Sequence, residues 1–247
     1  MPESIAYCLK TVFCLTTNFI NKSITAVIIV ITLAEIDRSL VNKTVNKANQ
    51  VITKTDLRKN LLGQRRALSV DEWRIKSDRI IQVLRNDRAF RSAQTVLAYF
   101  STRQEPDLSN LWTEIEQTVP NQKLQNQTFG FPLCEGNNLL WRQWRLGDPL
   151  VAGKFGIQEP DRGADIILPE QVDLMLVPCV GCDRAGYRCG YGGGFYDRLL
   201  ARPEWRSVQT IGIVFDFAVV ERMPVDSWDQ PLDRICHDRG FLSLKTN

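Results

Sequence analysis

The sequence predicts an α/β domain with a mainly parallel sheet, and three observations support this fold class. Strand-like apolar runs alternate with helix-like stretches from residue 53 onward. The run VDLMLVPCV, at 172–180, is apolar along its whole length, as expected of a strand buried on both faces. The composition is that of a globular protein, because 44% of the 247 residues are hydrophobic and 24% are charged.

We predict that residues 1–52 form an N-terminal extension and that residues 53–247 form one domain. The extension is rich in Thr, Ile, Val and Asn, and its apolar run, Ile24–Ala34, has eleven residues where a membrane span needs about 20. Three interpretations stay open for it: a disordered or loosely helical extension, a membrane or partner anchor, and a targeting segment. A start codon assigned too far upstream would also produce such a segment.

The domain is predicted to begin with a basic helix. The stretch KTDLRKNLLGQRRAL, at 54–68, places Leu57, Leu61 and Leu68 at spacings that can share one helix face. Lysines and arginines occupy much of the remainder. We interpret these basic side chains as the solvent-exposed surface of the helix.

A second helix is predicted at 70–86, because Ser69 and Glu72 before it have the spacing of a capping box. The short apolar run at 95–100 is typical of a strand. Pro106 suits the first turn of a third helix, since that turn leaves its amide hydrogens unpaired and proline has none to lose.

Later strands are predicted from apolar runs at 129–134, 138–144, 172–180, 210–217 and 240–244. Pro132 limits the first of them to an edge or an end of the sheet, because proline cannot donate to the strand ladder. A further helix is expected at 195–201, directly after a glycine-rich segment.

The net charge of +3 argues against nucleic acid or a membrane surface as the main partner. An anionic substrate would therefore need a local basic site. His237 is the only histidine and is interpreted as a surface residue. Unless His237 serves, the sequence has no histidine for a Ser-His-Asp triad and no multi-histidine metal site.

The seven cysteines form no regular disulfide framework, and their odd count argues against a disulfide-stapled secreted domain. Cys179 and Cys182 make one close pair, with Cys189 and Cys236 further on. We interpret them as small buried side chains. A metal or redox role is the alternative, although zinc sites usually show two close pairs.

The segment RCGYGGGFYDR, Arg188–Arg198, is the strongest candidate for a ligand site. It matches neither a P-loop nor a dinucleotide fingerprint, because no Lys-Ser or Lys-Thr closes it and Phe195 stands where a last glycine would be. Consecutive glycines still allow several backbone N–H groups to point into one concavity, and a helix start favours anions. Arg188 would add charge, and Asp197 could hold Mg²⁺ on a phosphate. The alternative is a plain glycine-rich turn.

Ligands of open α/β sheets bind beyond the carboxyl ends of the strands. The loop after Phe100, the glycine segment and the loop after Phe217 are therefore expected near one another. Glu105 lies in the first of these loops, and Asp229 and Asp233 follow the third. Each acid alone is an ordinary loop residue, but their shared position favours a site.

Five ordered blocks resemble the 5-formyltetrahydrofolate cyclo-ligase family, also called methenyltetrahydrofolate synthetase, over about residues 54–244. They are KTDLRKNLLGQRRAL, YFSTRQEPDLSNLW, GKFGIQEP, VDLMLVPCVGCDRAGYRCGYGGGFYDRLL and IGIVFDFAVVERMPVDSWDQPLDRI. The resemblance implies a three-layer α/β/α domain. It also implies ATP-driven closure of 5-formyltetrahydrofolate to 5,10-methenyltetrahydrofolate, with Mg²⁺, giving ADP and phosphate.

The same resemblance implies roles for individual residues. Arg188 and Glu105 would act in catalysis, Phe100 and Glu105 would contact the folate, and Asp197 and Asp229 would hold Mg²⁺. The implied ATP-binding positions are Lys54, Arg58, Arg188, Cys189, Gly190, Tyr191, Gly192, Gly193, Gly194, Phe195 and Tyr196. The implied partners are the folate and ATP alone, without nucleic acid or membrane, for a cytoplasmic monomer.

Some positions depart from the family pattern. Leu108 replaces a frequent threonine, Cys182 a phenylalanine, Cys189 a leucine and Trp228 a histidine. These changes bear on fine substrate contacts rather than on the reaction. The alternative function is a sugar-phosphate- or CoA-type α/β enzyme, or a phosphate-ligand binding protein, that uses the same glycine loop.

Overall fold

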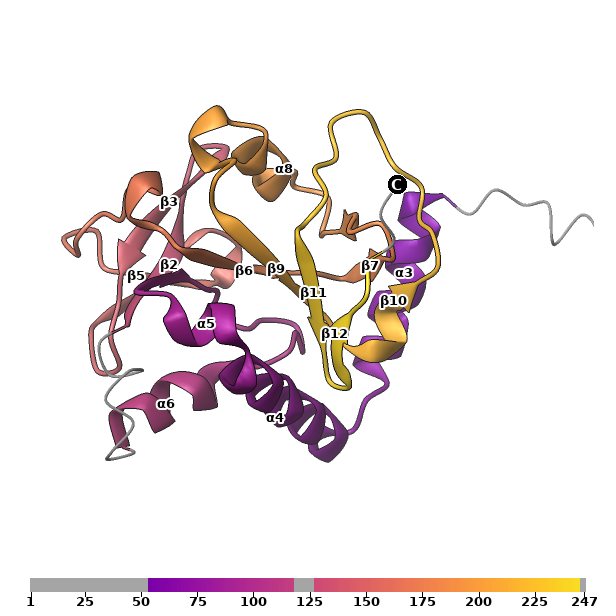
Figure 1. Cartoon of the computed structure of the whole chain (residues 1–247), viewed down its shortest axis with the longest axis horizontal. Coiled ribbons are helices and arrows are strands. Elements are labelled where there is room, and N and C mark those ends of the chain that lie inside the picture. The colour runs from indigo at the N-terminus through magenta and orange to yellow at the C-terminus, as the bar shows by residue number, and fades with distance from the viewer. Residues whose placement is uncertain (1–52, 118–126, 245–247) are drawn as a thin grey trace, which may run out of the picture. The chain divides into compact units, whose positions relative to one another are not determined.

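The computed structural model describes residues 53–117 and 127–244, and its centre is a seven-stranded sheet in the order β12-β11-β9-β6-β1-β2-β3 (Figure 1). The five central strands are parallel, and β3 and β12 are antiparallel at the edges. This confirms the mainly parallel α/β sheet. The strands are β1 (Thr95–Leu97), β2 (Thr128–Glu135), β3 (Asn138–Gln143), β6 (Leu174–Pro178), β9 (Gln209–Ile213), β11 (Arg234–His237) and β12 (Gly240–Leu242).

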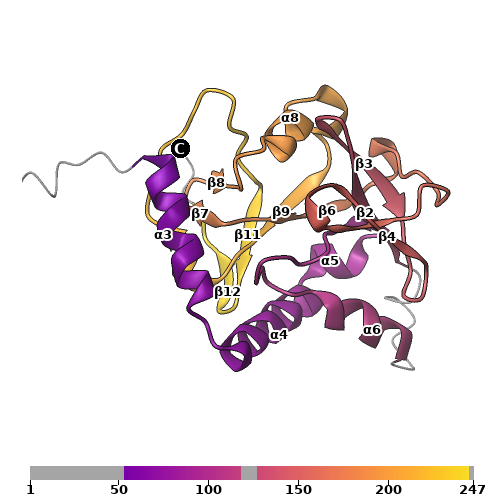
Figure 2. The same cartoon turned by 180° about the vertical axis from the view of Figure 1, so that it is seen from behind.

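Helices cover both faces of this sheet (Figures 1 and 2). Alternate residues of β6 belong to different core clusters, because side chains of a strand point to opposite faces: Leu174 packs with one cluster and Met175 with the other. The first cluster includes α4 (Val70–Asn86), α5 (Arg88–Ser92) and α6 (Ser109–Gln117), and the second includes α3 (Lys54–Arg66) and α8 (Phe195–Leu200). The expected three-layer arrangement is therefore confirmed.

The first two predicted helices are confirmed. Helix α4 has the predicted bounds because its capping box forms: Glu72 N donates to Ser69 Oγ (3.3 Å), and Ser69 N donates to Glu72 Oε2 (3.0 Å). Helix α3 buries Leu61 in its own layer, but Leu68 lies beyond the helix end and packs against the opposite cluster. The predicted shared face of α3 is wrong at that position.

Helix α6 begins at Ser109, three residues later than Pro106 suggested. The carbonyl of Pro106 instead accepts a hydrogen bond from the Tyr99 hydroxyl (2.8 Å), and Asp107 Oδ1 accepts one from Ser109 N (3.0 Å). Side-chain contacts of this kind compete with the first helical turn. Pro106 therefore belongs to the loop that leads into the helix.

Pro132 lies inside β2, so its predicted place at an edge or an end of the sheet is wrong. Strand β1 pairs with β2 only along Thr128–Gly130, and beyond that point β2 has β3 as its ladder partner, with Pro132 opposite Trp141. Proline lacks an amide hydrogen, and here β1 has already ended where that hydrogen would be needed. Proline does avoid a position that must donate to a neighbouring strand. Strand β2 meets that requirement inside the sheet, because the part that contains Pro132 is paired with β3 alone.

Shorter elements complete the fold and escaped the sequence patterns. A small sheet contains β10 (Val219–Val220), β7 (Gly181–Asp183) and β8 (Arg188–Cys189), and a hairpin contains β4 (Leu150–Ala152) and β5 (Gln158–Pro160). Single 3-10 turns occur at Lys154–Gly156, Pro169–Gln171, Pro203–Trp205 and Asp216–Ala218. Segments of two to three residues are too short for a periodicity argument.

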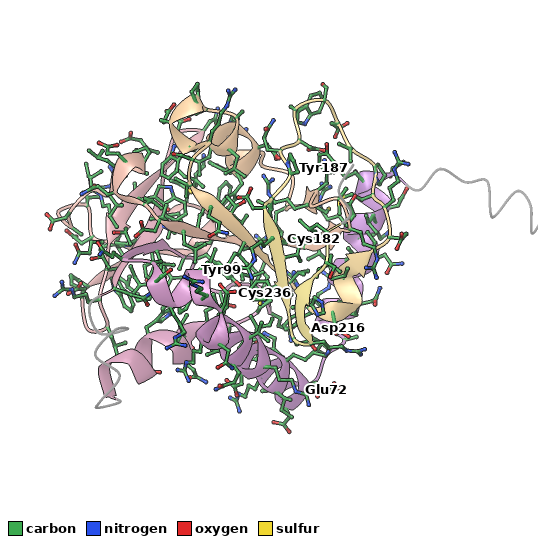
Figure 3. All side chains as sticks on the ribbon, in the orientation of Figure 1. Glu72, Tyr99, Cys182, Tyr187, Asp216 and Cys236 are labelled. Carbon is green, nitrogen blue, oxygen red and sulfur yellow. The ribbon has the colours of Figure 1, made fainter. Side chains whose placement is uncertain are left out.

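His237 ends strand β11 and is half-buried, so its interpretation as a surface residue is only partly correct. Burial lowers the pKa of this imidazole. Cys182 and Cys236 lie in the interior on β7 and β11 (Figure 3), and Cys179 and Cys189 are also buried. Burial raises the pKa of Cys182 and Cys236, which keeps both thiols protonated.

The predicted N-terminal extension lies outside the described residues. Among the residues that the structure does describe, every helix is too short or too polar to cross a bilayer.

Candidate active site

A cavity of about 660 Å³ opens at the carboxyl ends of β1 and β6. It is lined by the loop after β1, by the glycine segment, by the start of α3 and by the loop at 226–229, which come from distant parts of the sequence. The predicted site residues that line it are Lys54, Arg58, Phe100, Glu105, Arg188, Gly190, Tyr191, Gly192, Gly193, Gly194, Phe195, Tyr196, Asp197 and Asp229. Cys189 is the exception, because its side chain is fully buried in the core.

The glycine segment turns its backbone toward this cavity. Gly192 and Gly194 have φ angles of 96° and 65°, which favour glycine. In the described part of the chain, no acceptor takes a hydrogen bond from the backbone N–H groups of Gly192, Gly193 or Gly194. Helix α8, which follows, has only six residues. The loop itself therefore supplies the donors that an anion would need.

Arginine side chains hold the glycine segment in place. Arg58 Nε donates to the Gly190 carbonyl (2.7 Å). Arg188 is 5% exposed, and its guanidinium donates to Asp197 Oδ1 (2.8 Å) and to the Gln230 carbonyl (2.9 Å). A planar, two-armed donor of this kind fixes two partners at once. The loop is thus clamped at its first glycine and at the residue that follows Tyr196.

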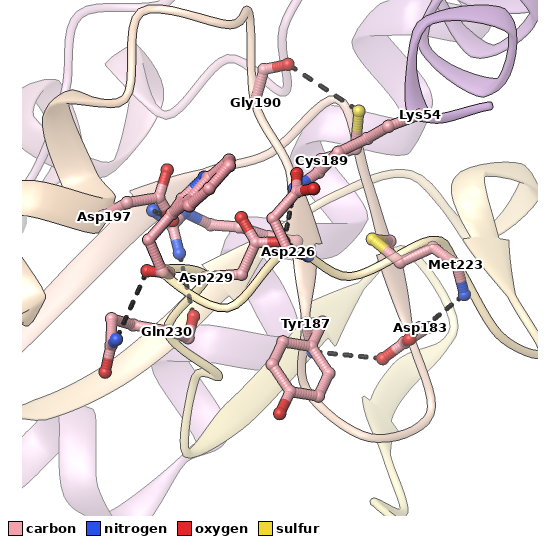
Figure 4. A network of polar contacts seen from close by, with 12 residues as sticks. Lys54, Asp183, Tyr187, Cys189, Gly190, Asp197, Met223, Asp226, Asp229 and Gln230 are labelled. Atoms are coloured by element: carbon pink, nitrogen blue, oxygen red, sulfur yellow. Dashed lines mark hydrogen bonds and ion pairs between the residues drawn. The ribbon is translucent and has the colours of Figure 1, made fainter.

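Lys54 and two aspartates form a second charged group at the cavity (Figure 4). The Lys54 ammonium contacts Asp226 Oδ2 at 3.4 Å and makes a shorter ion pair with Asp229 Oδ2. Asp229 Oδ2 also accepts a hydrogen bond from Asp226 N (2.8 Å), which closes a turn within the 226–229 loop. Helix α3 is therefore tied to the 226–229 loop at one end and to the glycine segment one turn later.

Glu105 is the most buried acid of the predicted set, at 4% exposure. Its Oε2 accepts hydrogen bonds from Thr102 N (2.9 Å) and Thr102 Oγ1 (3.2 Å). The chain reaches this position through Arg103 and Gln104, whose φ angles of 50° and 57° are uncommon for residues other than glycine. A tight turn therefore directs the carboxylate into the cavity.

Burial raises the pKa of Glu105 above its ordinary value of 4.5. Hydrogen bonds from Thr102 and Tyr191 and the charge of Arg65 act in the opposite direction without cancelling the effect of burial. A buried carboxylate with donors around it is suited to accept hydrogen bonds from the polar edge of a ligand.

Phe100 forms one wall of the cavity. Its ring stacks on Phe131 at 4.1 Å with an interplanar angle of 10°, and Trp144 meets it edge-on at 5.2 Å. The two contacts fix the orientation of a half-buried ring. A flat aromatic ligand can pack against such a surface.

The donors for a metal ion are the carboxylates of Asp197 and Asp229, which both line the cavity. In the described ranges, no group of three or more His, Cys, Asp or Glu side chains could hold a metal by itself. Mg²⁺ is usually bound by one or two carboxylates together with substrate phosphates and water. The two aspartates fit that pattern as oxygen donors.

Several lining residues were missed from the sequence. Phe155 is 60% exposed with a φ of 65°, and Glu159 is 5% exposed and accepts from Cys134 N (3.0 Å). Both belong to the GKFGIQEP block, which was singled out without a role for its side chains. Gly153 is required there, because a Cβ would lie 2.1 Å from Glu159 Cδ. Trp228, 64% exposed, lines the cavity as well.

Arg65 contradicts the interpretation of the first helix as a solvent-exposed basic surface. It is 1% exposed, and its guanidinium donates to the Cys179 carbonyl (2.6 Å) and to the Tyr191 hydroxyl (2.7 Å). Asp233 lies away from the cavity and accepts from Thr210 N and Oγ1, both at 2.7 Å. Helical spacing does distinguish Arg65, which lies four residues after Leu61 on the predicted apolar face, from Arg66, which lies off that face and is exposed.

Comparison with known proteins gives one consistent family. A family model described as the 5-formyltetrahydrofolate cyclo-ligase family matches residues 50–238. The 5-formyltetrahydrofolate cyclo-ligase of Escherichia coli K12 is 34% identical over 144 residues, which cover 58% of this chain and 77% of that protein. The enzyme of the same name from Haemophilus influenzae is 30% identical over 146 residues, covering 58% and 74%.

The solved structures agree with the sequence relatives. The NMR structure of Aquifex aeolicus 5,10-methenyltetrahydrofolate synthetase matches with a TM-score of 0.67 and 34% sequence identity, and the match covers 78% of this chain and 94% of that one. The synthetase from Mycoplasma pneumoniae has a TM-score of 0.58 at 24% identity, which is a likeness of fold.

Proposed function

The chain belongs to the 5-formyltetrahydrofolate cyclo-ligase family, and we propose that it closes 5-formyltetrahydrofolate to 5,10-methenyltetrahydrofolate with ATP and Mg²⁺, releasing ADP and phosphate. One observation carries the proposal. A single cavity brings together the free N–H groups of the glycine segment, several cations, and a buried acid beside an aromatic wall. Such a site suits two ligands at once, one rich in phosphate and one aromatic.

The chemistry explains why both ligands must meet. The formyl group on N5 is an amide, and its oxygen is a poor leaving group. In the proposed reaction that oxygen attacks the γ-phosphorus of ATP, and ADP departs. N10 then attacks the activated carbon, the C–O bond to phosphate breaks, and N10 loses its proton. The protein contributes positioning and charge stabilisation rather than a side-chain nucleophile.

The phosphates would lie along the glycine segment. The backbone N–H groups of Gly192, Gly193 and Gly194 have no other acceptor among the described residues, so an anion can take them without breaking a protein contact. Arg58 and Arg188 border the same loop and would neutralise charge. When bound through Asp197 and Asp229, Mg²⁺ would offset the negative charge of the phosphate oxygens.

The folate would occupy the side of the cavity formed by the loop after β1. Glu105 would accept hydrogen bonds from the N–H groups of the pterin, which are the donors that a carboxylate recognises. Phe100, fixed by Phe131 and Trp144, would pack against the ring.

Turnover tests the proposal directly. Purified protein with ATP, Mg²⁺ and 5-formyltetrahydrofolate should develop the absorbance of the methenyl product. Absence of turnover in a protein that still binds ATP would overturn the assignment. Thermal melts with sugar phosphates and CoA serve as the comparison, because shifts with those ligands and none with the folate would favour the rival class of enzyme.

Removing divalent cations is expected to abolish turnover, because Lys54 and Arg188 at the cavity already pair with the two aspartates and would not fully offset the added charge of the phosphates. Asp197→Asn and Asp229→Asn should each raise the Mg²⁺ concentration for half-maximal activity roughly tenfold or more, since even indirect changes cost about 10–100-fold in metal affinity. Asp71→Asn, at an exposed position in the first turn of α4, is the matched control. Full activity after chelation would contradict the metal requirement.

Gly192→Ala is expected to raise the KM for ATP about 5–30-fold. The φ of 96° costs an alanine about 1–2 kcal/mol, and the loop would move to relieve it. Gly190→Ala is the matched comparison, because Gly190 lacks a positive φ and its Cβ would meet nothing within 4 Å. Steady-state kinetics at saturating folate measure both. Equal effects at the two positions would show that backbone conformation does not set ATP binding.

We further propose that the enzyme works as a monomer in the cytoplasm. The cysteines among the described residues are all free, which is typical of a reducing compartment. Light scattering of the purified protein and fractionation of cells that express the full chain test the two statements.

A further inference from the structure

A chain of hydrogen bonds crosses the cavity floor between the two proposed ligand sites. Arg65 Nη1 on α3 donates to the Tyr191 hydroxyl (2.7 Å), and Tyr191 lines the cavity beside Glu105, where its hydroxyl favours the ionised carboxylate. A guanidinium can only donate, so the tyrosine oxygen accepts from Arg65 and its own proton is left available for Glu105. The three residues come from α3, from the glycine segment and from the loop after β1.

Both ends of this chain are fixed by other contacts. The second arm of Arg65 donates to the Cys179 carbonyl at 2.6 Å, just beyond the end of β6. Glu105 is held by Thr102 N and Thr102 Oγ1, and its carbonyl accepts from Trp73 Nε1 (2.8 Å). Tyr191 is different, because it stands between Gly190 and Gly192 in the loop and is 38% exposed. The middle residue is therefore the one whose position depends on the loop.

We propose that Tyr191 is a positioning residue that couples occupancy of the glycine loop to the placement of Glu105, so that ATP and 5-formyltetrahydrofolate bind synergistically. The inference rests on the proposed function and goes beyond it, because it assigns the tyrosine hydroxyl to the folate side of the reaction. Arg58 and Arg188 hold the two ends of the loop, and an anion on the N–H groups between them would fix the part that carries the Tyr191 hydroxyl beside Glu105. Coupling of this kind is reciprocal between the two ligands.

The electrostatic surroundings of Glu105 agree with this role. Burial raises the pKa of Glu105, while Tyr191 and Arg65 favour its ionised form. Tyr99 and Tyr196 feel the charge of the same carboxylate, and burial raises the pKa of each phenol, so both stay neutral. Among these neighbours Arg65 is the cation: its charge favours the ionised Glu105, and its hydrogen bond holds the Tyr191 hydroxyl in place. Loss of the hydroxyl should therefore raise the pKa of Glu105 further.

Tyr191→Phe tests the inference, because it removes one hydroxyl and keeps the ring that Arg103 covers at 5.4 Å. The dissociation constant of 5-formyltetrahydrofolate is measured by calorimetry with and without a non-hydrolysable ATP analogue. In the wild type the analogue should tighten folate binding, and in the variant this gain should fall about tenfold, as expected for one hydrogen bond to a charged group. The acid limb of kcat/KM should also move to higher pH.

Tyr187→Phe is the matched control, since Tyr187 is partly buried against the core, is not among the residues that line the cavity, and should leave the coupling unchanged. In a Glu105→Gln background, Tyr191→Phe should have little further effect, because the two changes break one contact. Additive effects, or unchanged coupling and an unmoved acid limb, overturn the inference. A wild type that turns over but shows no gain from the analogue also overturns it, whereas a wild type that binds no folate overturns the proposed function instead.

Discussion

Replacing Arg188 by lysine is expected to lower kcat by roughly 10²–10³-fold, the usual cost of losing one donor that stabilises developing charge. Lysine keeps the positive charge, but it cannot hold Asp197 Oδ1 and the Gln230 carbonyl in one plane as the guanidinium does. The reacting phosphate would then keep a cation nearby but lose the guanidinium donors and the fixed position of the loop. Single-turnover measurements with saturating ATP separate this loss from weaker binding.

The buried position of Arg188 requires a folding control. Its side chain is 4% exposed, so thermal melting of the variant must accompany the kinetics. Arg206→Lys makes the same chemical change at an exposed position and should leave kcat unaltered. A folded Arg188→Lys protein with near-normal kcat would remove Arg188 from the catalytic machinery.

Glu105→Gln is expected to lower kcat/KM for 5-formyltetrahydrofolate by about 10²-fold. The amide keeps the shape of the side chain but carries no charge, and a buried site that loses its one good acceptor leaves the donors of the ligand unpaired. ATP binding should change less, apart from the coupling through Tyr191. Glu204→Gln, at an exposed position, is the matched control.

The pH dependence of the wild type follows from the same residue. Because burial raises the pKa of Glu105, the carboxylate takes up its proton at a higher pH than an ordinary glutamate would. The ionised form is the acceptor, so activity is complete above the raised pKa and declines as the pH falls through it. The acid limb of kcat/KM should therefore lie above 4.5 and disappear in Glu105→Gln. An acid limb that persists unchanged in the variant would assign it to another group.

Sequence patterns that span a few neighbouring residues correctly predicted helix α4 and strand β6. The capping box at Ser69 and Glu72 placed the start of α4 correctly, because both partners lie within one helical turn. The apolar run of β6 was likewise sufficient, since a strand buried on both faces needs no polar partner. The strands of the small sheet could not be found this way, as they exist only through their pairing with distant residues.

The candidate site also combines features that neighbouring residues determine with features that only the fold determines. The backbone freedom of Gly192 can be inferred from the glycine run alone. That Gly192 and Glu105 line the same cavity depends on the fold. Arg65 and Arg66 are adjacent and chemically identical, yet one is buried and the other exposed. Helical spacing from Leu61 places Arg65 on the buried face, but its partners, the Cys179 carbonyl and the Tyr191 hydroxyl, lie more than a hundred residues away and depend on the fold.

Three arginines of this site each donate a hydrogen bond to a main-chain carbonyl: Arg58 to Gly190, Arg65 to Cys179 and Arg188 to Gln230. A carbonyl is present whatever residue carries it. The residues that supply the carbonyls can therefore be substituted without loss of the hydrogen bond, whereas the arginines that donate cannot. Saturation mutagenesis should find Cys179 and Gln230 permissive to residues of compatible size, and Arg58, Arg65 and Arg188 intolerant even of lysine.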